Sequence, residues 1–169
     1  HGADVNAKNN DGETVLMTAS EYGKLGVVKC LVEHGADINA KDKNGKTALI
    51  YAVERGQLGI VEYFIENGID INAKYDYNKN PSIYYKGDGI KYYSYKGVTI
   101  LMIASMNIRS SIKTLEIFKY LINKGADVNI EDYKCNTALD FVEAIDIGNE
   151  EFKKYKEEII KILMESGAK

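Results

Sequence analysis

The feature that most constrains this chain is a short motif that returns at a fixed step. The segment HGADVNAK at residues 1–8 recurs as HGADINAK at 34–41 and as NGIDINAK at 67–74, two steps of 33 residues. Later copies are KGADVN at 124–129 and SGA at 166–168. A second motif, Gly-x-Thr before apolar residues, runs in phase at 12–16, 45–49 and 97–101, and returns at 135–139 with Cys135 in place of glycine. This periodicity predicts an array of stacked repeats.

Each repeat carries the start and stop signals of two short helices. Thr14, Thr47, Thr99 and Thr137 suit N-caps, because a threonine hydroxyl can accept a hydrogen bond from the first turn. Gly23 and Gly56 should end the first helix, and the glycines of the HGAD motif the second. Helices of two to three turns are marginal alone, so they must be stabilised by stacking. We expect repeat-interface burial for eight residues: Leu16, Leu31, Leu49, Phe64, Leu101, Leu121, Leu139 and Leu163.

These two phased motifs closely resemble the ankyrin repeat over nearly the whole chain. The resemblance implies a β-turn and two antiparallel helices per repeat, stacked into a curved solenoid. Two residues of the family's motif are missing here. The proline after the threonine is replaced by Val15, Ala48, Ile100 and Ala138. The histidine two positions later is replaced by Met17, Ile50, Met102 and Asp140. We expect these departures to lower stability without changing the fold.

The expected fold is therefore an all-α ankyrin-repeat solenoid with one inserted tyrosine-rich β-hairpin. Residues 1–8 would be the tail of a preceding repeat, followed by repeats at 9–41 and 42–74. A repeat at 75–131 carries an insertion at about 75–96, and a C-terminal, capping-like repeat spans 132–169. In the last helix Phe152, Tyr155, Ile159, Ile160 and Leu163 should face inward and its charges should stay solvated. No polar cap precedes the first repeat, so we expect a fragment of a longer array.

The insertion concentrates tyrosine, with seven of the chain's 13 tyrosines. Two β-rich runs flank Gly87-Asp88-Gly89, which predicts a β-hairpin within residues 82–95. Tyrosine is well suited to interfaces. One hypothesis is that the hairpin contacts a partner through Tyr84, Tyr85, Tyr92 and Tyr93. The alternatives are that it packs into its own groove or forms a disordered loop.

Candidate chemistry is sparse. Asp76-x-Asn78-x-Asn80 opens like a calcium loop, but Pro81 and Gly87 replace the glycine and the glutamate that such a loop needs. The recurring aspartates are explained by turn chemistry. We expect Cys30 to be an inert core residue, Cys135 to be exposed, and the two to form no disulfide. We predict no catalytic residue, no metal and no cofactor, and hence no enzyme.

Recognition is the function that remains for a solenoid. The resemblance implies a partner protein held by turn tips and exposed first-helix positions, here Tyr22, Lys43, Arg55, Met106 and Tyr133 besides the hairpin tyrosines. A net charge of −3 and a pI near 5.5 argue against nucleic acid. We expect a monomer without membrane insertion, intracellular and cytoplasmic, with a secreted effector as the alternative. A second hypothesis is a regulatory or targeting segment of a larger protein whose activity lies outside this chain.

Overall fold

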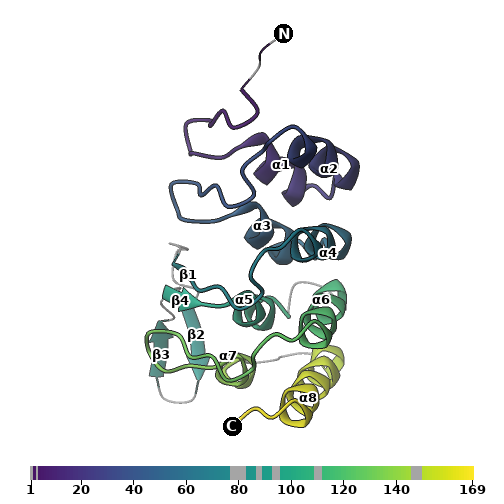
Figure 1. Cartoon of the computed structure of the whole chain (residues 1–169). Helices are drawn as coiled ribbons and strands as arrows, with labels where there is room; N and C mark the ends of the chain where they lie inside the picture. The colour runs from purple at the N-terminus through teal and green to yellow at the C-terminus, as the bar shows by residue number, and fades with distance from the viewer. Residues whose placement is uncertain are drawn as a thin grey trace.

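The chain forms four helix pairs stacked one on another (Figure 1). The computed structural model describes residues 2, 4–76, 83–86, 89–92, 96–108, 112–145 and 150–169, with 83–86, 89–92, 112, 150 and 151 described by their backbone alone. The pairs are α1 (Val15–Glu21) with α2 (Leu25–Glu33), α3 (Ala48–Glu54) with α4 (Leu58–Glu66), α5 (Ile100–Met106) with α6 (Ile112–Asn123), and α7 (Ala138–Glu143) with α8 (Glu150–Glu165). We number these pairs, with their loops, as units 1 to 4. The all-α solenoid predicted from the repeats is confirmed.

The threonine caps form largely as predicted. The hydroxyls of Thr14, Thr47 and Thr99 accept from the N–H three residues on, at 3.3–3.4 Å. Thr137 differs, because its N–H and its hydroxyl both donate to the Asp140 carboxylate at 2.8 Å. The first helices of units 1 and 2 and the second helices of all four units end at glycines with positive φ, including Gly23 at 70°. The first helices of units 3 and 4 end without a glycine, at Asn107 and Ala144. Local sequence therefore determines where the first helices begin and where most of the helices end.

The loop motif bonds within its own repeat and to the next. Asp4, Asp37, Asp70 and Asp127 each accept from the N–H two residues on, at 2.8–2.9 Å. This is the turn chemistry predicted from their recurrence. The asparagine two positions later has a second role that the sequence analysis missed. Asn6 accepts from the N–H of Asp37 at 2.8 Å and donates to the carbonyl of Gly35, so neighbouring loops are linked.

The insertion leaves and re-enters the turn tip of unit 3 through a short stem. Strand β1 (Tyr75–Asp76) pairs antiparallel with β4 (Lys96–Val98), and the Asp76 carboxylate accepts from the Gly97 N–H at 2.6 Å. The predicted hairpin is confirmed by β2 (Ile83–Lys86) and β3 (Gly89–Tyr92), which pair in antiparallel register. The stem was not predicted. It closes the base of the insertion, so the repeat continues on either side.

The core runs along the stack between neighbouring units. Of the eight predicted core residues, six are buried; Leu31 and Leu139 are only half-buried and pack against the core from its edge. The prediction that Cys30 is a core residue is wrong, because this thiol is exposed. The equivalent residues of the other units, Tyr63, Tyr120 and Ile162, are half-buried, so this helix position lies at the edge of the core. Cys135 is exposed, as predicted, and has a φ of 60°.

The last helix is amphipathic, as predicted. Ile159 and Leu163 are fully buried, whereas Lys153, Lys154, Glu157 and Lys161 are exposed. Lys156 departs from the expected solvated face. Its ammonium donates to the carbonyls of Glu143 and Ile145, both at 2.8 Å, and so satisfies acceptors at the end of α7.

Candidate protein-binding surface

The first helices α1, α3, α5 and α7 lie between the loops and the second helices (Figure 1). Their sides toward the loops, together with the turn tips, form the surface on which the predicted binding residues lie. In units 1 and 2, which we call the front half, this surface is open at the C-terminal ends of the first helices, although Tyr51, at the position of Thr18 in unit 2, is half-buried. Thr18 of α1 is exposed, and so are the C-cap residues of the two first helices, Tyr22 after α1 and Arg55 after α3. The front half therefore presents an aromatic ring and a guanidinium at equivalent repeat positions.

Arg55 is held by the unit before it. Its Nε donates to Oε1 of Glu21 at 3.1 Å, and a second guanidinium nitrogen reaches the same oxygen. The bond to Glu21 and its charge raise the pKa of Arg55, which is charged in any case. The pair is partly solvated and contributes little to stability. Its effect is to orient the guanidinium beside Tyr22, whose ring is 67% exposed.

A second polar cluster lies under this surface. The Tyr51 hydroxyl is 2.9 Å from a carboxylate oxygen of Glu13 and 2.9 Å from one of Asp42. A phenol carries one proton, so it donates to one carboxylate at a time. Burial, the bonds to Asp42 and Glu13, and their charges together raise the pKa of Tyr51. Lys46 lies 5.2 Å from the ring centre and pairs with Glu54 at 2.7 Å. The cluster links the tips of units 1 and 2.

Two predicted contact residues lie on turn tips. Lys43 is exposed, and its backbone N–H donates to the carbonyl of Asp11 at 3.0 Å, which fixes the tip of unit 2 against that of unit 1. Tyr133 is 65% exposed, and a Cβ built on Gly97 would lie 2.7 Å from its ring. One ring face therefore packs on β4, and Lys74 lies 5.8 Å from the ring centre. The other side of the ring is accessible.

The prediction that Met106 lies on the exposed binding surface is wrong. It is 6% exposed, and its neighbour Asn107 is also buried. In units 3 and 4, which we call the back half, the positions equivalent to Thr18, Glu21 and Tyr22 are closed. They hold Ile103, Met106 and Asn107 in unit 3, and Phe141, Ala144 and Ile145 in unit 4, all at most 8% exposed. Five of the six belong to the core, and the sequence signal was their apolar character at positions that are polar in the front half. The sixth, Asn107, is buried with its side-chain amide donating to the carbonyl of Ile103 at 2.7 Å.

The hairpin tyrosines cannot be placed on this surface. The backbones of Tyr84, Tyr85 and Tyr92 lie in β2 and β3, but their side chains and the whole of Tyr93 lie outside the described residues. The calcium-like segment lies outside as well, apart from Asp76. That aspartate serves as the turn acceptor for Gly97.

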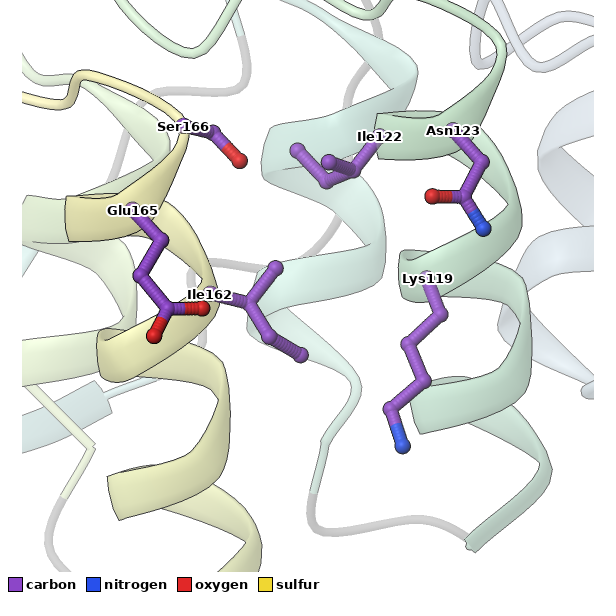
Figure 2. A pocket seen from close by; sticks show the side chains of 6 residues that line it. All are labelled: Lys119, Ile122, Asn123, Ile162, Glu165 and Ser166. Carbon is purple, nitrogen blue, oxygen red and sulfur yellow. The ribbon is translucent and has the colours of Figure 1, made fainter.

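A shallow cavity of about 350 Å³ lies on the opposite side of the stack, between α6 and α8 (Figure 2). Ile122 and Ile162 line it together with Lys119, Asn123, Glu165 and Ser166. Its lining holds one lysine and one glutamate, with no nucleophile–base pair. A second cavity of about 390 Å³ lies among the loops of units 2 and 3, beside Lys41, Lys74 and the buried Tyr75.

Two further kinds of feature are missing from the part of the chain that the structure describes. Within the described ranges there is no cluster of three or more histidine, cysteine, aspartate or glutamate side chains that could hold a metal ion. None of the helices the structure describes has the length and apolar character needed to cross a bilayer.

Comparison with known proteins agrees with the repeats. Residues 1–75 match a family model described as ankyrin repeats in three copies, and residues 96–133 match one described as a single ankyrin repeat. The two stretches together cover more than half of the chain. No curated protein matches the sequence.

Proposed function

Because the chain belongs to the ankyrin-repeat family, whose repeats are generally protein–protein interaction modules, we propose that it binds a partner protein through the open face of its front half. Tyr22 and Arg55 lie at the centre of the proposed site, and Lys43 lies on the adjoining tip. Tyr133 extends the site along the row of tips.

The observation that carries this proposal is the difference between equivalent positions. Tyr22 is 67% exposed, whereas Asn107 and Ile145, its equivalents in units 3 and 4, are 8% and 3% exposed. The Arg55 guanidinium is already oriented by Glu21, so it loses little side-chain freedom on binding. Tyrosine has few side-chain torsions to immobilise. Tyrosine and arginine are also the residue types most enriched among interface hot spots.

The charges of the surface indicate the chemistry of the partner. The Arg55 guanidinium is paired with Glu21, and Lys43 and Asp11 lie on neighbouring tips joined by a backbone hydrogen bond, so charges of both signs lie along the face. Such a surface favours a partner that offers an apolar pocket for the Tyr22 ring and a carboxylate for Arg55. Long-range attraction of a polyanion is not expected from it.

The test compares proteins captured by the full chain and by two variants. We expect the double variant Tyr22→Ala, Arg55→Ala to lose the partner, with at least a 10-fold loss of affinity, since hot-spot truncations cost about 2 kcal/mol or more. Its melting temperature should stay unchanged because both side chains are exposed. The control is Lys161→Ala, Met164→Ala on the exposed side of α8, which should keep the partner. If both variants capture the same proteins with equal affinity, the proposed face is wrong.

The tyrosine-rich hairpin is the proposed second contact. Replacing residues 79–94 with a short Gly-Ser linker above the β1–β4 stem tests it. Lower affinity with an unchanged melting temperature supports a direct contact. A lower melting temperature with unchanged affinity would assign the hairpin a structural role only.

A further inference from the structure

The hydrogen-bonded link between successive loops is broken at one place in the array. Asn6 accepts from the N–H of Asp37 at 2.8 Å and donates to the carbonyl of Gly35 at 3.2 Å. Two later loops form part of the same link, through the bonds of the Asp127 N–H to Asn72 at 2.9 Å and of Asn129 to the Gly167 carbonyl at 3.0 Å. Among the described residues, the side chain of Asn39 forms no such bond. The loops at 34–41 and 67–74 are therefore not linked by their asparagine.

The backbone groups that this link would join are nevertheless in place. Gly68 has a φ of 88°, against 85° at Gly35. Asp70 accepts from the N–H of Asn72 at 2.9 Å, and the Ala73 N–H donates to the Asp70 carbonyl at 3.1 Å, as in the preceding loop. The Asp70 N–H and the Gly68 carbonyl therefore point toward the preceding loop, and no described residue bonds to either.

One residue of the loop motif explains the break. Between the glycine and the aspartate, three other loops hold an alanine that is 8–9% exposed: Ala36, Ala126 and Ala168. The loop at 67–74 holds the larger Ile69 there, and this side chain is half-buried. Ile69 and Asn39 both line the cavity of about 390 Å³ between the two loops. The isoleucine therefore keeps the loops apart where an asparagine would otherwise join them.

The cavity carries an excess of positive charge. Lys41 and Lys74 line it, and neither forms a salt bridge with a described residue. The carboxylate in the lining is that of Asp70, which already accepts from a backbone N–H. Ile69 and the ring of Tyr75 add apolar surface. A ligand that fits this lining carries negative charge beside a group that both donates and accepts hydrogen bonds.

We infer that this cavity binds a side-chain carboxamide carried by an acidic peptide segment. The carboxamide oxygen accepts from the Asp70 N–H, and its NH₂ group donates to the Gly68 carbonyl, as the Asn6 amide does one loop earlier. A carboxylate in the same place would set an oxygen without a proton against the Gly68 carbonyl. Carboxylates beside the carboxamide pair with Lys41 and Lys74.

The free chain provides the first test, through exchange of backbone amide protons with water measured by NMR. The Asp70 N–H should exchange several-fold faster than the N–H groups of Asp37 and Asp127, which are bonded to asparagines. Ile69→Ala should remove this difference, because alanine lets the loops close. Ile71→Ala, in the same loop but outside the cavity lining, is the control and should preserve it.

The second test titrates the labelled chain with a capped tripeptide, glutamate-asparagine-glutamate, whose asparagine supplies its one primary amide. We expect the Asp70 N–H resonance to shift and its exchange to slow. The same tripeptide with alanine at its centre should bind at least several-fold more weakly. Lys41→Gln should weaken binding of the asparagine tripeptide about 2- to 5-fold, as for an exposed ion pair. Lys154→Gln, an exposed lysine on α8, is its control.

Three outcomes would overturn the inference. The first is an Asp70 N–H that exchanges as slowly as those of Asp37 and Asp127 in the free chain. The second is equal affinity for the asparagine and alanine tripeptides, which would leave a site for acidic groups only. The third is that free glutamine binds as tightly as the tripeptide, which would assign the cavity to a small metabolite. None of them bears on the proposed contact surface of Tyr22 and Arg55, because the titration uses a defined peptide and reads the cavity alone.

Discussion

The front and back halves of this array use the same repeat positions in opposite ways. At the first-helix positions of Thr18 and Tyr22, the front half is polar: Thr18, Tyr22 and Arg55 are exposed and Tyr51 is half-buried. At the position of Thr18 the back half holds Ile103 and Phe141, which are 0% and 2% exposed. All four units nevertheless share the helix pair and its connecting loop. The repeat motif therefore determines the backbone conformation of each unit. The residues between the motif positions determine which part of the surface is exposed and available for binding.

The largest effect expected from this comparison is on stability. Phe141→Ala should lower the free energy of unfolding by about 3–5 kcal/mol, since a buried phenylalanine is lost. Thr18→Ala, at the equivalent position of unit 1, should change it by less than about 0.5 kcal/mol. Urea denaturation followed by circular dichroism measures both. Repeat arrays can unfold in steps, so a second probe should confirm a single transition.

Ile103→Ala extends the same test to unit 3, with an expected loss of about 2–5 kcal/mol. Equal, small costs at Thr18, Ile103 and Phe141 would show that the back half is as open as the front. The proposed restriction of partner binding to units 1 and 2 would then lose its basis.

The fold was predictable because its signals are local and repeated. Thr14 caps α1 and Gly23 ends it through bonds within a few residues, and each signal returns in phase. The β1–β4 stem was missed because it pairs residues on either side of a long insertion, and no local motif marks Asp76 as the acceptor for Gly97.

The surface was harder to predict than the fold. Met106 was assigned to the binding face from its repeat position, although its apolar side chain was a signal of burial. Cys30 was assigned to the core on the same grounds, but its position lies at the core's edge, where Tyr63, Tyr120 and Ile162 of the other units are also only half-buried. In both cases exposure depends on which segments cover a position, and a single repeat does not contain that information.

A smaller effect concerns the turn glycine that the last unit lacks. Gly12 has a φ of 80°, and a Cβ there would lie 2.9 Å from the backbone nitrogen of Lys43. Gly12→Ala should therefore cost about 1–3 kcal/mol, from the left-handed backbone and the close approach of the next tip.

Cys135 occupies the equivalent position in unit 4 at a φ of 60°. Replacing it relieves only backbone strain, so Cys135→Gly should stabilise the chain by about 1 kcal/mol or less. Cys135→Ala is the control and should be neutral. If Cys135→Gly lowered the free energy of unfolding as much as Gly12→Ala does, the tip of unit 4 would be packed like the tips before it.

The last prediction concerns the pH dependence of stability, and its effect at neutral pH is the smallest. It compares two tyrosines with raised pKa values, of which only Tyr51 is also hydrogen-bonded to carboxylates. Burial, with a contribution from the charge of Asp70, raises the pKa of Tyr75 to about 12, and this side chain is 7% exposed at the start of the back half. In the front half, Tyr51 has a raised pKa from burial together with its bonds to Asp42 and Glu13.

An unfolded tyrosine titrates near pH 10, so the unfolded chain releases its proton first. The free energy of unfolding should be independent of Tyr75 below pH 10 and should fall as pH rises from 10 to 12, by about 1 kcal/mol at pH 11. Tyr75→Phe should remove that part of the loss of stability at alkaline pH.

Glu13→Gln should lower the pKa of Tyr51 and leave that of Tyr75 unchanged. The pKa of Tyr51 is measured by ultraviolet titration, as the difference between the Glu13→Gln variant and the same variant that also carries Tyr51→Phe. If Glu13→Gln shifted both tyrosines equally, the shift at Tyr51 would not come from its own bond to Glu13.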